Sequence, residues 1–229
     1  MENASKALIM AGSILMSLLI IGILVFGYYQ LSEVQQLKGD ADASKKIIEY
    51  GIKFEQYNKR IYGSELLSLA NLHEDYQKTQ VEERGYQDIK INVNIKTQIE
   101  INGTIYFTSG TQDISNILNG KDKLEDAINT LETRKKYKGK TVKYYSQRSY
   151  REIALAYNKE YPSNMSDGDI RMDIEDNAIG EIKDLVKAIE EYQILKSSYT
   201  EFKNKKFDCT QISYDKYNGR VNGLTYKEL

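Results

Sequence analysis

The hydrophobic pattern begins with a long stretch that carries no charge. From Ala7 to Ser32 there is no acidic or basic residue. A helix needs about 20 apolar residues to cross the hydrocarbon layer, so this stretch predicts a short N-terminal tail over 1–6 and a transmembrane helix over 7–32. A secretory signal has a shorter apolar core of about 7–15 residues and a small-residue cleavage site. We therefore expect an anchor that stays uncleaved.

Small residues recur along this span. Ala7 and Ala11, and likewise Ser13 and Ser17, form small-xxx-small pairs, and Gly12 lies between them. Such pairs let two helices approach closely in lipid. These residues are therefore our candidates for helix association. The alternative is that they are ordinary small residues, which are common in any membrane helix.

Alternation of apolar and polar residues predicts strands further along the chain. Isoleucine and valine alternate with lysine and asparagine over 89–96, as in a half-buried strand. Asn-Gly pairs at 102–103 and 218–219 favour the type I′ turn of a tight hairpin, because both central residues need positive φ. We expect about three antiparallel strands over 87–107 and a second hairpin over 207–226.

Helical periodicity accounts for much of the remaining chain. Ser64 is expected to cap a helix that places Leu66 and His73 on one face. A histidine on such a face is more often a packed or rim residue than a ligand. The strongest amphipathic pattern runs from Ile179 to about Phe202.

The region over 112–176 is also helical in pattern, but it is interrupted. Asn119-Gly120 predicts the end of a helix, and 141–145 predicts a short strand. Ser149 and Glu152 have the spacing of a capping box at the start of another helix. This region is therefore expected to be a helical insertion into a simpler core.

Strands at both ends of the folded part, with helices between them, predict an α+β fold. The expected division is a membrane-proximal helix or linker over 33–63, followed by a soluble domain over 64–229. Composition agrees with a folded domain, since 41% of residues are hydrophobic and 28% are charged. The 32 basic and 33 acidic residues nearly balance, which gives no reason to expect nucleic acid as a partner.

The inventory of reactive side chains is small. His73 is the only histidine and Cys209 the only cysteine, which argues against catalytic triads and zinc sites. Cys209 is expected to be a small buried residue. No phosphate-binding glycine loop or hydrolase motif occurs. We therefore predict no catalytic residue, no cofactor and no metal site, and a protein that is not an enzyme.

Two charged segments are candidate binding sites. The acidic segment 166–176 offers Asp167, Asp169 and Asp173 as calcium ligands, but its spacing does not match an EF-hand, so a solvated loop is expected instead. The basic run 134–140 has the charge to contact phosphate or lipid head groups. A charged helix end is the simpler interpretation of that run.

The order of these features resembles that of type IV pilins and pseudopilins. The start Met1 to Gly12 runs directly into an apolar helix, then come Phe54-x-x-Tyr57, the segment 63–71, an alternating strand and a closing hairpin. The likeness covers 1–107 and about the last twenty residues, and it extends to small anchored proteins of clostridia-like Gram-positive bacteria. The basic leader, the cleavage point and the fifth-position glutamate of pilins have no counterpart here, so the resemblance implies architecture rather than prepilin processing.

These observations lead to one expected function and one alternative. The resemblance implies a structural or assembly protein, a pilin-like component of a surface filament or secretion apparatus. Its partners would be the bilayer and other subunits, itself included, through the N-terminal helix. The short tail favours a cytoplasmic N-terminus, which makes the protein single-pass in the cell membrane with an extracytoplasmic domain. The alternative is an anchored binding or sensor module for a peptide, a glycan or an envelope partner.

Overall fold

The computed structural model describes residues 16, 18–32, 45–46, 48–216 and 219–229. The chain forms two compact units, Met1–Ile52 and Lys53–Leu229. In the first unit, 18–32 is a helix whose side chains are all exposed. No helix within the described residues is both long and apolar enough to cross a membrane.

Part of the predicted span cannot be compared with the structure. Residues 7–15 and 17 lie outside the described residues, and so do all five candidates for helix association: Ala7, Ala11, Gly12, Ser13 and Ser17. The predicted membrane anchor and its association face therefore stay predictions.

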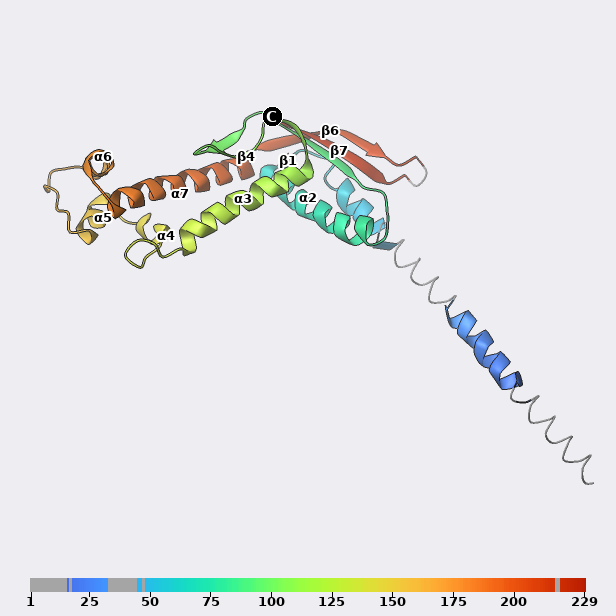
Figure 1. Ribbon diagram of the computed structural model, residues 1–229. Coiled ribbons are helices and arrows are strands. Elements are labelled where there is room, and N and C mark those ends of the chain that lie inside the picture. Colours follow the sequence, from blue (N-terminus) through green and yellow to red (C-terminus); the bar gives the residue numbers. More distant parts are fainter. Residues whose placement is uncertain (1–15, 17, 33–44, 47, 217–218) are drawn as a thin grey trace, which may run out of the picture. The chain divides into compact units, whose positions relative to one another are not determined.

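The second unit mixes helices and strands, which confirms the α+β class (Figure 1). Its elements are β1 (Ile61–Tyr62), α2 (Gly63–Tyr76), the π-helix η1 (Gln77–Glu82), β2 (Lys90–Ile95), β3 (Ile99–Ile101), β4 (Thr104–Phe107), β5 (Gly110–Asp113), α3 (Ile114–Thr133), α4 (Val142–Tyr145), α5 (Tyr150–Ala156), α6 (Asp167–Asn177), α7 (Glu181–Asn204), β6 (Lys206–Tyr214) and β7 (Val221–Glu228).

The main sheet has five strands in the order β1-β6-β7-β2-β5. All neighbours are antiparallel except β7 and β2, which are parallel. Strands β3 and β4 form a separate two-stranded hairpin. The prediction of three consecutive antiparallel strands over 87–107 was therefore wrong in its pairing. The alternating strand β2 pairs with β5 and β7 and not with β3, because the chain leaves the main sheet after Ile95.

Both Asn-Gly hairpins occur. Asn102 and Gly103 have φ of 51° and 78°, so both central residues of the first turn have the positive φ that a type I′ turn requires. Gly219 has φ of 68° between β6 and β7, and its partner at 218 lies outside the described residues. The first turn was therefore predicted correctly. The second hairpin also forms, but its loop is longer than a two-residue type I′ turn, because the Asp215 amide donates to the Arg220 carbonyl oxygen and the Gly219 amide donates to the Asp215 carbonyl oxygen.

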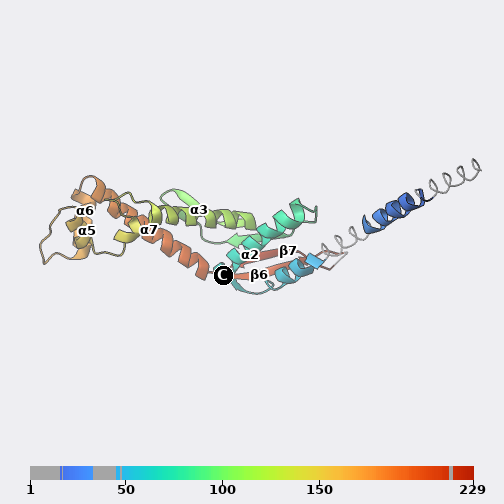
Figure 2. The same ribbon diagram turned by 90° about the horizontal axis from the view of Figure 1, so that it is seen from below.

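Helices α2 and α3 pack on one face of the main sheet, and α7 packs against both of these helices and against β3 (Figures 1 and 2). The core lies in this layer, where Leu66, Ile91 and Phe202 are fully buried. Gly63 starts α2 directly against α7, since a Cβ atom there would lie 1.9 Å from the Phe202 carbonyl oxygen. Helix α7 continues beyond the sheet, and α4, α5 and α6 pack around its other end (Figure 1).

One helix boundary and one unit boundary differ from the prediction. Tyr62, not Ser64, is the N-cap of α2, and its amide donates to the Glu65 carboxylate at 2.9 Å. The folded unit also begins at Lys53 rather than at 64. Phe54 is fully buried, and its ring meets that of Tyr76 edge to face at 5.7 Å.

The predicted end of a helix at Asn119-Gly120 was wrong, because α3 runs through it. A Cβ atom on Gly120 would lie 2.2 Å from the Tyr106 carbonyl oxygen and 3.0 Å from the Phe107 ring. The glycine therefore allows α3 to pack closely on β4, and it does not terminate the helix.

Two further segments are helical where other structure was expected. The predicted strand over 141–145 is the short helix α4, capped by the Thr141 hydroxyl. The predicted solvated loop over 166–176 is largely α6, capped by the Ser166 side chain. The capping box of Ser149 and Glu152 at the start of α5 is confirmed.

Candidate functional site

The helix-free face of the main sheet carries polar side chains. In β2, Ile91, Val93 and Ile95 are buried under the helices, so Lys90 and Asn92 point to the opposite face. Lys90 is in register with Gly223 of β7, and Asn92 with Thr225. On the other side of β7, Ser213 is in register with Gly223 and Gln211 with Thr225. Two cross-strand rows of polar residues result.

These rows line a groove with a volume of about 370 Å³. Gly223 forms its floor, because a Cβ atom there would lie 2.6 Å from Ser213 Oγ and 3.2 Å from the Lys90 carbonyl oxygen. Amides, hydroxyls, one lysine and one aspartate dominate the lining, which consists of Gln87, Asp88, Lys90, Asn92, Gln211, Ser213, Asn222, Gly223, Leu224 and Thr225. Amide and hydroxyl groups both donate and accept hydrogen bonds, so the groove suits a ligand that does the same.

Sequence reasoning missed this groove. Its residues come from β2, β6 and β7, which are far apart in the chain, and the parallel pairing of β2 with β7 brings them together. The one hint in the sequence was the polar residues that alternate with the apolar ones over 89–96. They predicted that one face of this strand meets solvent, but not which strands lie beside it.

His73 is a packed residue, as predicted. It is 6% exposed, and its Nε2 lies 2.8 Å from the Ile89 carbonyl oxygen and 3.4 Å from Asp88 Oδ1. The Gln77 amide lies 3.3 Å from the same ring nitrogen and donates to Asp88. This nitrogen therefore fixes the entry into β2 against α2 and is not free for catalysis.

A cleft of about 420 Å³ beside His73 also contains Glu74, Glu82, Asp88 and Asp113. Asp113 accepts from the Ser115 amide as the N-cap of α3, and Glu74 pairs with Lys78 at 2.6 Å. In the described part of the chain, no group of three or more histidine, cysteine or acidic side chains is placed to hold a metal ion.

The acidic segment 166–176 holds helices together. The Asp167 carboxylate accepts the backbone N–H groups of Tyr150 and Arg151, each at 2.9 Å. Asp173 accepts from Lys159 at 2.9 Å and from the Tyr161 hydroxyl at 2.6 Å. These bonds hold the pKa of Asp173 well below its usual range, with the Lys159 bond as the largest cause. The three aspartates do not converge on one point.

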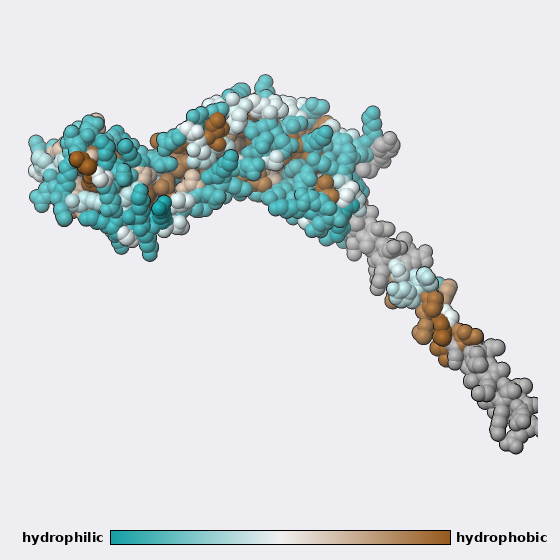
Figure 3. Space-filling model, in the orientation of Figure 1, coloured by the Kyte–Doolittle hydropathy of each residue, from teal (hydrophilic) through white to brown (hydrophobic). Residues whose placement is uncertain are grey.

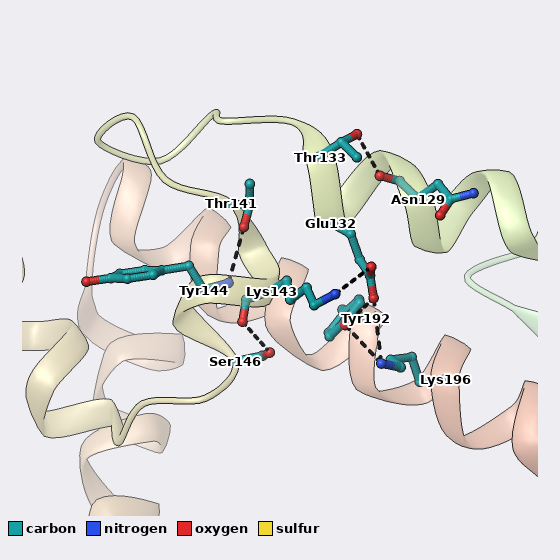
Figure 4. A network of polar contacts seen from close by, with 9 residues as sticks. All are labelled: Asn129, Glu132, Thr133, Thr141, Lys143, Tyr144, Ser146, Tyr192 and Lys196. Carbon is teal, nitrogen blue, oxygen red and sulfur yellow. Dashed lines mark hydrogen bonds and ion pairs between the residues drawn. The ribbon is translucent and has the colours of Figure 1, made fainter.

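Glu132 lies in α3 and links this helix to α4 and α7 (Figure 4). Its carboxylate accepts from the Tyr192 hydroxyl of α7 at 2.6 Å and from Lys143 of α4 at 2.9 Å, and Lys196 lies 3.6 Å away. These partners lower the pKa of Glu132, and the Tyr192 hydrogen bond is the largest cause. The cluster is saturated with internal partners, so it has a structural role.

Cys209 is only half-buried in β6, so the prediction of a buried residue holds only in part. Its Sγ donates to the Gln211 carbonyl oxygen at 3.5 Å, and burial raises the pKa of the thiol. A thiol that is harder to ionise is a poor nucleophile.

The second unit is thus an α+β domain with a polar groove on the open face of a mixed sheet. No protein-family model, curated protein or solved structure matches this chain.

Proposed function

We propose that this protein is a membrane-anchored binding module that holds a glycan in the groove on the open sheet face. The groove carries the proposal. Sugar hydroxyls donate and accept hydrogen bonds in the same way as the amides and hydroxyls of Asn92, Gln211, Ser213 and Thr225 that line it. The described ionisable clusters around His73, Asp173 and Glu132 are occupied by internal partners, which favours binding over catalysis.

Anchoring rests on the described helix of the first unit. Its large apolar side chains are between 49% and 72% exposed, and Figure 3 shows apolar colour along it, whereas the visible surface of the second unit is mostly hydrophilic. Such a surface needs a cover of lipid or other helices. We assign the second unit to the extracytoplasmic side.

The test of the groove uses the full chain in detergent on an array of oligosaccharides, with a peptide array in parallel. Asn92→Ala or Gln211→Ala removes one hydrogen-bonding group, worth about 1 kcal/mol, and should weaken glycan binding about fivefold. Gln98→Ala, an exposed glutamine outside the groove, is the matched control and should change nothing. Equal effects of the three variants, or binding to peptides alone, would refute the glycan assignment.

The test of the anchor is membrane extraction. Leu24 is 67% exposed in the described helix, and Ile52 is 55% exposed after it. Leu24→Lys places a charge inside the proposed span, which is costly in lipid, and should release part of the protein from membranes washed at alkaline pH. Ile52→Lys should not. Release of the wild-type chain by the same wash would contradict the anchor.

An assembly role is the second candidate, since the exposed apolar helix can also pack on copies of itself. It predicts oligomers in detergent that weaken when Gly12 and Ser13 are both changed to leucine, because close helix approach needs small residues. A chain that is monomeric before and after the change would exclude it.

A further inference from the structure

The segment 134–151 concentrates positive charge in an otherwise balanced chain. It contains eight lysines and arginines and no acidic residue, against totals of 32 basic and 33 acidic residues. The basic residues are Arg134, Lys135, Lys136, Lys138, Lys140, Lys143, Arg148 and Arg151. The segment runs from the end of α3 through α4 to the start of α5.

The tip of this segment is a fixed turn. Tyr137 and Lys140 form an isolated β-bridge, and Lys138 and Gly139 between them have φ of 44° and 71°. Tyr137 is only 4% exposed, and the Lys138 amide donates to Glu181 at the start of α7 at 3.0 Å. A partner that binds the turn would therefore meet side chains whose backbone is already ordered, which lowers the entropic cost of binding.

Half of the cations are held by internal partners. Lys143 pairs with Glu132 at 2.9 Å and Arg148 lies 3.8 Å from Glu152. Arg151 donates to the carbonyl groups of residues 161, 162 and 165, and Lys138 donates to that of residue 156. These bonds hold the local fold together.

The other four cations, Arg134, Lys135, Lys136 and Lys140, are exposed and form no ion pair with any described carboxylate. Glu191 lines a small cavity of about 190 Å³ together with Arg134 and Lys136 but is not in ion-pair contact with them. The nearby carboxylates of Glu132 and Glu181 are already engaged by Lys143 and by the Lys138 amide.

Several of the basic side chains lie over tyrosine rings in cation–π contacts. Lys140 Nζ and Arg148 Cζ lie 5.2 Å and 4.3 Å from the centre of the Tyr144 ring, and Lys136 Nζ lies 5.2 Å from that of Tyr137. Tyr144 is 39% exposed, so its hydroxyl adds a donor beside the cations. We call Arg134, Lys135, Lys136, Lys140 and Tyr144 the basic surface.

We propose that the basic surface binds a linear polymer that carries repeated phosphate groups and no nucleobases. Its cations follow one another along a turn. Only Arg134 and Lys136 share a cavity, which the Glu191 carboxylate also lines, so the arrangement matches a row of anions better than one small ion. Lysine and arginine side chains are the usual partners of phosphate oxygens. This proposal goes beyond the groove and does not depend on it.

A lipid surface fits less well. Within 134–151, Tyr144 is the only large apolar side chain of the described chain that is strongly exposed, and interfacial binding needs an apolar face.

Single-stranded nucleic acid is also disfavoured. Proteins bind single strands by stacking the bases on open aromatic side chains. The face of the Tyr144 ring is already in contact with the cations of Lys140 and Arg148. Nucleic acid is therefore kept as an outcome of the test.

The test measures binding of the full chain in detergent to long-chain inorganic polyphosphate at several salt concentrations. The affinity should fall steeply and log-linearly with salt, because phosphate contacts release counterions. Changing Arg134, Lys135, Lys136 and Lys140 together to glutamine should weaken binding by roughly tenfold or more. The matched control changes four exposed lysines elsewhere to glutamine: Lys96, Lys123, Lys187 and Lys227.

Both variants lose the same number of lysine and arginine charges, so equal losses of affinity would overturn the proposal by showing a response to net charge alone. No binding near physiological salt would overturn it as well, as would tighter binding to a single-stranded oligonucleotide. A larger loss of affinity for anionic phospholipid vesicles than for polyphosphate, when the four cations are changed, would also overturn it. Unchanged melting temperatures for both variants would show that the fold is intact. Gln211→Ala should leave polyphosphate binding unaltered, which separates this surface from the groove.

Discussion

Phe107 and Phe202 stack face to face, with ring centres 4.0 Å apart and planes only 4° from parallel. Phe107 ends β4 and Phe202 lies in the last turn of α7, so the contact fastens the separate β3–β4 hairpin to the longest described helix. Both rings are almost completely buried. The pair also lies beside Phe207, whose ring centre is 6.0 Å from that of Phe202.

Phe202→Ala should destabilise the second unit by about 3–5 kcal/mol, the usual cost of removing a buried phenylalanine. Chemical denaturation followed by circular dichroism measures the free energy of unfolding. Ile194→Ala, at a position of the same helix that is 47% exposed, should cost much less. Similar costs at both positions would show that the aromatic stack contributes little.

Gly120→Ala should destabilise the protein even though alanine is the better helix former by about 1 kcal/mol. The new methyl group would meet the Tyr106 carbonyl oxygen at 2.2 Å, and such overpacking costs about 1–3 kcal/mol. Gly168→Ala in α6 is the control, because its nearest atom would be 3.8 Å away. Thermal melts should therefore move in opposite directions for the two substitutions.

Glu132→Gln should lower stability in a pH-dependent manner. The folded state lowers the pKa of Glu132 below its ordinary value of 4.5, so its ionised form stabilises the fold above that value. The contribution is lost as the pH falls through the lowered folded pKa. Melting temperatures of wild type and variant should differ at pH 7 and converge in acid. Glu160→Gln, at an exposed position, should show no such pH-dependent difference.

Glu190→Gln should have the opposite effect on stability to Glu132→Gln. Burial, followed by the neighbouring Glu175 carboxyl, raises the pKa of Glu190, and Arg171 opposes the rise without cancelling it. The ionised form is therefore penalised in the folded state, and the penalty is complete above the raised folded pKa and disappears below the ordinary value of 4.5. The variant should gain stability at neutral pH relative to wild type and lose this advantage in acid.

The loss of the Arg171 ion pair at 2.5 Å is the competing effect in that variant. A lower melting temperature of Glu190→Gln at all pH values would show that the ion pair outweighs the cost of burying the charge. Glu191→Gln, one residue further along α7, serves as the control.

Local signals in the sequence predicted the local structure well. The Asn-Gly turn at 102–103, the capping box at Ser149 and the packed His73 all depend on neighbours within a few residues, or on one helix face. The same rules failed at Gly120, where the reason for a glycine is the Tyr106 carbonyl of another element. Tertiary packing there overrides the usual meaning of Asn-Gly.

The candidate sites show the same limit. The run 134–140 was visible as a block of charge, but the sequence could not show that Lys138 has internal partners, since the Ala156 carbonyl and the Glu181 carboxylate reach it only through folding. The groove was invisible because Asn92 and Thr225 meet only through the pairing of β2 with β7.

That parallel pair has a consequence for how the protein is made. The main sheet consists of β1, β6 and β7 on one side and β2 and β5 on the other, and the β7–β2 pairing is the seam that joins them. β2 ends at Ile95, whereas β7 begins at Val221. During synthesis, the edge of β2 that pairs with β7 therefore stays unpaired until the ribosome has made β7. A contact between residues so far apart in the chain also forms slowly. A chain interrupted before Val221 would expose the edge of β2, which is a site for pairing with other chains.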